Sequence, residues 1–509
     1  MCRKPGIPDR LSAQRCPGGR SGGILGVEGV LETIAPYAKR VSRLGPWVLA
    51  ALMTACTGGG AERPTPTQPT PSRNLPGSLT LVGHDPLLQR GMNAALAVWQ
   101  DFVYVGSRTD GSEGHPHAGV LVVSIDDPAN PQVTGEIGPP DEGNPGETAR
   151  ELRVWPAQRL LMVLNFECDP FLHACSGFPV EPTVRFYDIA GEHAGDPVLV
   201  STYRPTRTPH EFFLWQDPID PRRALIFMST PGFEEGSLIV TDISEAREGR
   251  FQEVASWTTS FPDPGPDDNL HSLSVSPDGT RAYLAFLTAG FFVLDTSEVA
   301  RGLPEPAIRL VTPLADRAQW PGRGAHSAVK VPGRDLVLTT DEVYGGPSPD
   351  DGCPWGWVHL IDVSDESKPE VISEYKVHPY NDEAYCSQVS AERDEGSSFS
   401  SHNPTVTEHL ALVTWHSAGL QVFSTKDPAQ PKQLAEFVPE PLDTVAMEDP
   451  ALSSGPDKVV MWSYPVIEDG LIYVVDIRNG LYVLEYHGPY GREVASIRFL
   501  ESNSNLGGA

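Results

Sequence analysis

Residues 401–431 read SHNPTVTEHLALVTWHSAGLQVFSTKDPAQP, and this stretch holds three short apolar runs in succession. The runs PTVTE, LALVTW and GLQVFS are separated by polar residues or by a glycine. Short runs rich in valine, leucine and aromatic residues, bounded by turn-forming residues, predict β-strands. The stretch therefore predicts three consecutive strands of one sheet.

The same pattern recurs along the chain. Its third run is the clearest, and it ends in successive copies at Ser124, Asp188, Asp242, Asp295, Asp362, Ser424 and Glu485. These positions lie about 60 residues apart on average. Two further apolar runs precede each copy, and a weaker segment such as PEVISEY follows it. Each repeat therefore predicts a sheet of three or four strands.

Seven such repeats predict an all-β protein, a seven-bladed β-propeller of four-stranded blades over residues 78–501. One four-stranded sheet cannot bury both of its faces, so neighbouring sheets must pack against each other. No long segment has the 3.6-residue period of an amphipathic helix. A pair of β-sandwiches would also accommodate these strands, but it would leave the regular period unexplained.

The two ends of this region predict how the ring closes. LTLVGH, residues 79–84, precedes the first repeat. We expect it to pair with the last blade near VASIRFL, residues 494–500. Residues 502–509 are predicted to form a tail beyond the ring.

Residues 1–55 have the order of a leader followed by a secretory signal peptide. The apolar run LGPWVLAALMTA, residues 44–55, follows Lys39, Arg40 and Arg43. This run is too short to cross a bilayer of about 30 Å as a helix, and small residues end it, as in a signal peptide. We therefore expect an exported protein without a transmembrane helix.

The residues LMTAC at the end of this signal resemble the lipobox of bacterial lipoproteins. That resemblance implies that Cys56 is lipidated and becomes the mature N-terminus, held in the cell envelope at the cell surface or the periplasmic face. A free cysteine after a chance apolar run is the alternative. Residues 1–40 precede an otherwise complete signal, and we expect them not to be translated. Residues 56–77 contain a stretch of alternating Pro and Thr, PTPTQPTP, which predicts an extended linker.

The remaining cysteines fit an oxidising compartment. They are Cys168, Cys175, Cys353 and Cys386. An even number in an exported domain predicts two disulfides, and CDPFLHAC would close a small loop. The pairing of Cys353 with Cys386 then follows by elimination, with four free thiols as the alternative.

The formal charge of −29 bears on whether the protein binds nucleic acid. Residues 1–55 carry a net charge of +5, so the rest of the chain carries −34. A surface this acidic repels phosphate backbones, which argues against nucleic-acid binding.

The repeats WVHLIDVSDESKPEVISEY and GVLVVSIDDPANPQVTGEI resemble the LVIVD repeat of bacterial cell-surface proteins and lipoproteins. The resemblance covers roughly residues 78–490 and departs at Ser124, Ser424 and Glu485, where the consensus aspartate is missing. It implies a β-propeller outside the cytoplasm. It implies no reaction, because the family has no settled activity.

Four consecutive repeats place a histidine at the start of the strand that would line the central channel: His210, His271, His326 and His402. Converging imidazoles could hold iron, copper or zinc, in a layout similar to the four-histidine iron site of carotenoid oxygenases. Each histidine could instead bond the backbone of a neighbouring blade and only lock the ring together. Binding of a ligand without a metal is a third alternative.

Two functions follow from these features. The first is a lipid-anchored, monomeric scaffold that binds another envelope protein or a glycan through its loops. The alternative is a metal-dependent propeller enzyme, such as an oxidoreductase, with a histidine cluster in its channel. The sequence contains no Gly-x-Ser-x-Gly elbow, no glycine-rich phosphate loop and no Cys-x-x-Cys, so no other catalytic class is indicated.

Overall fold

The computed structural model describes residues 74–507 except 140–145, 169–174, 176, 178, 232–237, 262–267, 322–323, 344–355 and 379–397. These residues belong to one compact unit, Ser72–Ala509. The predicted leader, the lipidation site Cys56 and the linker up to residue 73 lie outside the described residues, as do Cys353 and Cys386. None of the helices in the described ranges has both the length and the apolar character needed to span a bilayer.

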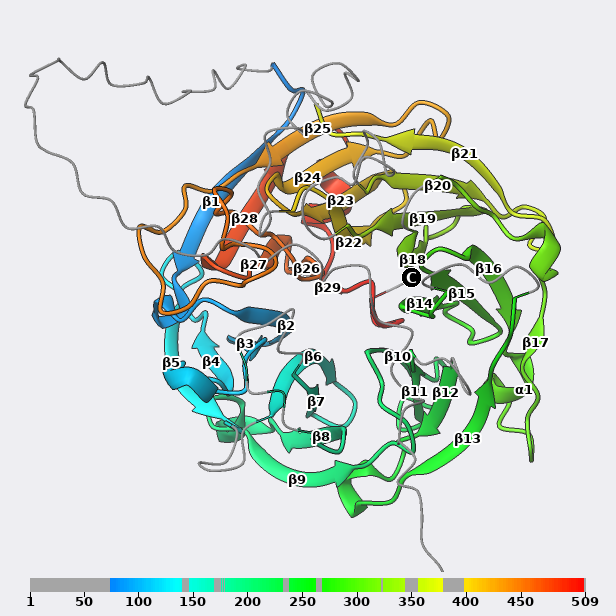
Figure 1. Cartoon of the computed structure of the whole chain (residues 1–509), viewed down its shortest axis with the longest axis horizontal. Coiled ribbons are helices and arrows are strands. Elements are labelled where there is room, and N and C mark those ends of the chain that lie inside the picture. Colours follow the sequence, from blue (N-terminus) through cyan, green and yellow to red (C-terminus); the bar gives the residue numbers. More distant parts are fainter. Residues whose placement is uncertain are drawn as a thin grey trace, which may run out of the picture. The chain divides into compact units, whose positions relative to one another are not determined.

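The described chain is a seven-bladed β-propeller, as the repeats predict (Figure 1). Blade 1 is formed by β2 (Asn93–Trp99), β3 (Phe102–Ser107), β4 (Val120–Ser124) and β5 (Gln132–Ile137). Blade 2 is formed by β6 (Glu147–Trp155), β7 (Leu160–Glu167), β8 (Thr183–Asp188) and β9 (Val198–Tyr203). A single pairing, Ser107 with Ala149, joins these two blades into one sheet.

The next four blades are separate sheets in which consecutive strands pair antiparallel. Blade 3 is formed by β10 (Glu211–Gln216), β11 (Ala224–Ser229), β12 (Leu238–Asp242) and β13 (Gln252–Trp257). Blade 4 is formed by β14 (Ser272–Val275), β15 (Arg281–Phe286), β16 (Gly290–Asp295) and β17 (Arg309–Leu310). Blade 5 is formed by β18 (Ala325–Lys330), β19 (Leu336–Asp341), β20 (Val358–Asp362) and β21 (Glu370–Tyr375). Blade 6 is formed by β22 (Ser401–Val406), β23 (Leu410–Trp415), β24 (Gly419–Ser424) and β25 (Lys432–Phe437).

Blade 7 uses strands from both ends of the described chain. Its sheet has the order β1 (Ser78–Asp85), β28 (Gly480–His487), β27 (Leu471–Asp476), β26 (Val466–Glu468) and β29 (Phe499–Leu500). The first strand therefore pairs with the last blade, as predicted, but its partner is β28, and the prediction that it pairs near residues 494–500 is wrong. That segment instead contains α3 (Gly491–Ala495) and β29, which pairs with the innermost strand β26. The outer edge of β28 has no strand of its own repeat to cover it, so β1 fills this position and closes the ring.

The helices in the described part of the chain are short and lie between strands. They are η1 (Leu87–Gln89), η2 (Ser112–Gly114), η3 (Gly191–Ala194), η4 (Ala246–Glu248), α1 (Ser297–Ala300), η5 (Leu314–Asp316) and α3.

Apolar side chains pack between neighbouring blades and form the core. Between blades 5 and 6, for example, Leu338 and Val358 belong to the same buried cluster as Trp415 and Phe423. Trp415 is completely buried, and burying an aromatic side chain of this size removes about 150–250 Å² from water. The adjacent sheets therefore cover both faces of the middle strands, whereas outer strands such as β9 keep exposed apolar side chains.

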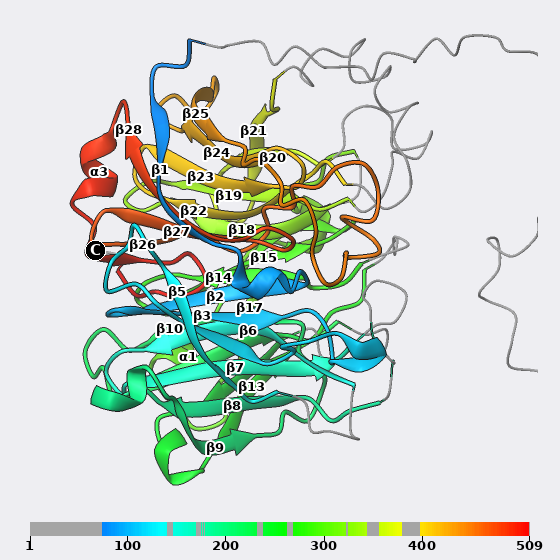
Figure 2. The same ribbon diagram turned by 90° about the vertical axis from the view of Figure 1, so that its left-hand side faces the viewer.

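The C-terminal residues cross the channel at the end opposite to the starts of the inner strands. The backbone N–H of Leu214 in β10 donates to the carbonyl oxygen of Asn503 at 3.1 Å, and its carbonyl oxygen accepts from the N–H of Asn505, also at 3.1 Å. The backbone N–H of Val406, at the end of β22, donates to the hydroxyl of Ser502. In Figure 1 this segment is the red trace in the centre of the ring, and Figure 2 shows α3 and the C-terminal end at one face. Residues 502–507, which the sequence suggests as a tail, thus connect blade 6 to blade 3.

Candidate metal centre

The four predicted histidines lie side by side in the channel. His210 and His271 immediately precede inner strands β10 and β14, and His326 and His402 lie in β18 and β22. The ring centroids of successive histidines are separated by 4.3, 3.9 and 4.2 Å. The repeat thus brings together side chains that are about 60 residues apart in sequence.

Two further residues of the cluster come from the middle strands. Glu342 directly follows β19, and His416 directly follows β23. The inner and middle strands of a blade are antiparallel, so the end of the middle strand lies beside the start of the inner strand. Glu342 and His416 therefore reach the same end of the channel as the histidines of the inner strands. The Glu342 side chain is only 7% exposed. Inspection of inner strands alone misses both residues, although His416 lies in the run LVTWHSAG and the position after each middle strand could have been compared between repeats.

The hydrogen bonds of His402 define which ring nitrogen faces the cluster. Its Nδ1 lies 2.6 Å from the carbonyl oxygen of Trp462 in blade 7. A carbonyl oxygen only accepts, so Nδ1 donates, and Nε2 is the ring nitrogen that faces the cluster. This Nε2 lies 3.1 Å from Oε1 of Glu342.

The same argument applies to His416. The hydroxyl of Ser398 donates its single proton to the carbonyl oxygen of Val343. Ser398 Oγ therefore accepts from Nδ1 of His416 at 3.0 Å. The neutral ring then presents the lone pair of Nε2, which lies 3.8 Å from Oε1 of Glu342.

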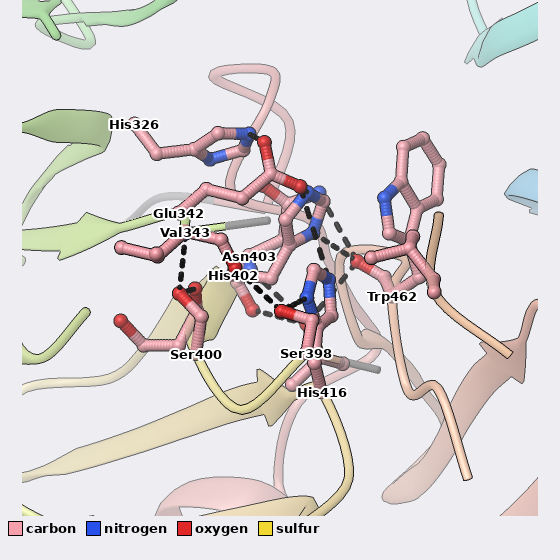
Figure 3. A network of polar contacts seen from close by, with 12 residues as sticks. His326, Glu342, Val343, Ser398, Ser400, His402, Asn403, His416 and Trp462 are labelled. Carbon is pink, nitrogen blue, oxygen red and sulfur yellow. Dashed lines mark hydrogen bonds and ion pairs between the residues drawn. The ribbon is translucent and has the colours of Figure 1, made fainter. Parts of the chain in front are cut away.

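His326 approaches the other oxygen of the same carboxylate. Ser327 Oγ donates to Oδ1 of Asn403 at 2.9 Å, so it must accept from Nδ1 of His326, also at 2.9 Å. Nε2 of His326 lies 3.3 Å from Oε2 of Glu342. Figure 3 shows Glu342 between His326 on one side and His402 and His416 on the other.

Burial keeps three imidazoles of this cluster, those of His271, His326 and His416, neutral. It lowers the pKa of His271 to about 4 and that of His416 to about 3. Burial and the neighbouring His271 and His402 also hold the pKa of His326 well below its ordinary value. Neutral imidazoles that aim lone pairs at a buried carboxylate leave several electron-rich atoms facing one another. Such an arrangement is costly unless a cation lies among them.

A cavity of about 260 Å³ lies over the cluster and is lined by His210, His271, His326, His402 and Glu342. Arg150 also lines it, with its guanidinium carbon 5.2 Å from the centre of the Phe166 ring and 5.7 Å from that of Trp462. Two more carboxylates of the cavity, Glu151 and Glu211, lie 3.0 and 3.8 Å from the guanidinium of Arg153. A small ligand could therefore reach the histidines and Glu342 beside one cationic side chain.

The donor atoms suit a transition metal. Imidazole nitrogen and carboxylate oxygen are ordinary ligands of iron, copper and zinc. Each of His326, His402 and His416 has its other ring nitrogen fixed by a hydrogen bond, as is usual for metal-ligating histidines. Nδ1 of His271 is buried and has no hydrogen-bond partner among the described residues. His210 contacts His271 through its ring and lies at the edge of the cluster.

The cysteines that the structure describes form one disulfide, between Cys168 and Cys175, with their Cα atoms 6.2 Å apart. It closes the loop that follows β7, as the spacing CDPFLHAC predicts. The predicted pairing of Cys353 with Cys386 lies outside the described residues.

Comparisons with known proteins identify no sequence relative. No family model matches the chain, and no curated protein matches it. Among solved structures, the chain is similar to the β-propeller domain of Cps50 (Swd1) from Myceliophteria thermophila, with 9% identity, 80% of this chain and 99% of that one covered, and a TM-score of 0.44. It is also similar to the periplasmic gluconolactonase PpgL of Pseudomonas aeruginosa, with 14% identity, 76% and 96% coverage, and a TM-score of 0.45. A third is Sqt1 of Chaetomium thermophilum, with 13% identity, 81% and 99% coverage, and a TM-score of 0.45.

Proposed function

We propose that this protein is a metal-dependent β-propeller of the bacterial cell envelope, which holds iron, copper or zinc among the histidines and Glu342 of its channel. The observation that carries the proposal is the common orientation of three imidazoles. His326, His402 and His416 each donate through Nδ1 to a fixed acceptor and direct Nε2 at Glu342. If these histidines only joined the blades, the hydrogen bonds of their Nδ1 atoms would suffice, and their Nε2 atoms would not need to face Glu342.

The location in the envelope rests on the sequence. The apolar run before Cys56, the likeness of LMTAC to a lipobox and the Pro/Thr-rich linker support export and lipid anchoring. The likeness to LVIVD repeats and the disulfide between Cys168 and Cys175 agree with an extracytoplasmic location.

The site supports catalysis better than a purely structural use of the metal. Structural metal sites are usually closed by four protein ligands, whereas catalytic sites keep a position open for water or substrate. Here the ligand set borders a cavity. The C-terminal segment crosses the opposite end of the channel, so we expect substrate to enter at the face where the inner strands start. The positive charge of Arg150 in the cavity favours an anionic substrate.

The test is the metal content of the full-length chain after expression with iron, copper and zinc supplied. We expect at least one equivalent of one of these metals by elemental analysis, and its loss in Glu342→Gln, which keeps the shape of the side chain but removes its charge. The control is His409→Gln, because His409 forms a 2.7 Å pair with Glu493 outside the channel. Metal-free wild-type protein would overturn the proposal and favour the scaffold function, in which the histidines only lock the blades.

A further inference from the structure

The potential ligands divide into two sets that share a single residue. One set is His271, His326 and Glu342, and the other is Glu342, His402 and His416. Within each set the donor atoms lie within 4.8 Å of one another. Among the described residues no group of this kind combines His326 with His402. The arrangement is therefore two three-ligand groups with Glu342 between them.

The two carboxylate oxygens of Glu342 are divided between the sets. Oε2 faces His326 at 3.3 Å, and Oε1 faces His402 at 3.1 Å and His416 at 3.8 Å. Two ligands that are each about 2.1 Å from a tetrahedral metal ion are about 3.4 Å apart. The three measured separations are close to this value, so each oxygen has the spacing needed to share an ion with the histidines on its own side.

Each set supplies three protein ligands and leaves a coordination position unfilled. His271, whose buried Nδ1 has no hydrogen-bond partner among the described residues, His326 and His402 all border the 260 Å³ cavity. An oxygen of water, hydroxide or an anionic substrate could therefore occupy the open positions from the cavity. A carboxylate that bridges two ions is common in two-metal sites, where the ions lie about 3.5–4 Å apart.

We propose that the channel binds two divalent transition-metal ions bridged by the carboxylate of Glu342, one with His271 and His326 and the other with His402 and His416. This inference rests on the proposed function and specifies its metal content. The two ions carry more positive charge than the one bridging carboxylate neutralises. The centre therefore selects small anionic ligands that can place an oxygen between the ions.

The decisive measurement uses metal-free, full-length protein titrated with Mn²⁺, followed by elemental analysis and electron paramagnetic resonance. We expect two equivalents of manganese and a spectrum broadened by exchange coupling between the ions. His416→Gln and His271→Gln should each retain one equivalent and show the six-line spectrum of an isolated ion. The control is His359→Gln, because His359 is also buried in blade 5 but pairs with Asp341 at 3.0 Å and belongs to neither set.

The outcomes separate this inference from the function on which it rests. A single equivalent in the wild type, still bound in His416→Gln but absent in His271→Gln, would overturn the two-ion centre and leave a one-metal propeller. Two equivalents without coupling would overturn the bridge through Glu342. No bound metal, either in this titration or after expression with iron, copper and zinc supplied, would overturn both proposals. The stoichiometry and spectrum of the wild type require no variant, so the inference stays testable if a variant fails to fold.

Discussion

The ionisation of Glu501 makes the stability of the folded protein depend on pH. Glu501 follows β29, is 1% exposed and belongs to the segment that crosses the channel. Burial raises the pKa of Glu501 to about 7, and the nearby guanidinium of Arg153 offsets only part of this effect. We predict that Glu501→Gln stabilises the protein above pH 7 and has almost no effect near pH 4.5.

The sign follows from the protons bound by the two states. The unfolded chain ionises this carboxyl around pH 4.5, whereas the folded protein holds the proton up to about pH 7. The stability that protonated Glu501 contributes is therefore complete below pH 4.5 and is lost as the pH rises through 7. At about 1.4 kcal/mol per pKa unit, the loss is about 3 kcal/mol. Glutamine cannot ionise, so the variant does not lose this stability.

The assay is thermal unfolding at pH 4.5 and pH 8, with a chelator present so that bound metal does not contribute. An unfolding entropy of about 2.1 cal/mol/K per residue over roughly 430 residues converts 3 kcal/mol into about 3 °C. The variant should melt about 3 °C above the wild type at pH 8 and within 1 °C of it, roughly, at pH 4.5. The exposed Glu440→Gln is the control, with no such difference. An equal shift at both pH values, or a less stable variant at pH 8, would refute the reasoning.

Two further predictions concern a turn and the anchor. Gly279→Ala should destabilise the protein by about 2–4 kcal/mol, because φ is +73° and the added Cβ would lie 2.6 Å from the Trp215 ring. The control is Gly114→Ala, where φ is +79° but no atom lies within 4 Å of the added Cβ, so this variant should cost only about 1 kcal/mol. Equal losses in urea denaturation would contradict the contact with Trp215. Cys56→Ser should move the protein from the membrane fraction to the extracytoplasmic soluble fraction, as read by fractionation and immunoblotting, and continued membrane association would exclude the lipid anchor.

The fold could be predicted because every repeat encodes the same local pattern. The apolar runs of residues 401–431 correspond to β22, β23 and β24, and equivalent strands occur in all seven blades. Residues 79–84 close the ring on the last blade, as predicted, but their exact partner was not predictable in the same way. They pair with β28 and not with residues 494–500, because the strand beside them depends on how these segments lie in space.

The sequence predicted four histidines of the site but not Glu342 or His416. His210, His271, His326 and His402 occupy one repeated position, so their proximity follows from the propeller geometry. Glu342 occupies a different position, after a middle strand, where most repeats have no potential ligand. Only His416 in the next repeat adds a second potential ligand at this position, so the periodic signal is weak, and the importance of Glu342 appears only when its carboxylate is seen between the imidazoles.

The structural and metal-binding explanations of the histidines address different nitrogen atoms. His402 does bond the backbone of the next blade, as the structural explanation requires, but it uses Nδ1 for this contact. That bond fixes the tautomer and leaves Nε2 facing Glu342. An imidazole with this pair of contacts both joins two blades and presents a ligand atom of fixed direction. The hydrogen bond that would explain the imidazole without chemistry is thus the same bond that prepares it to hold a metal.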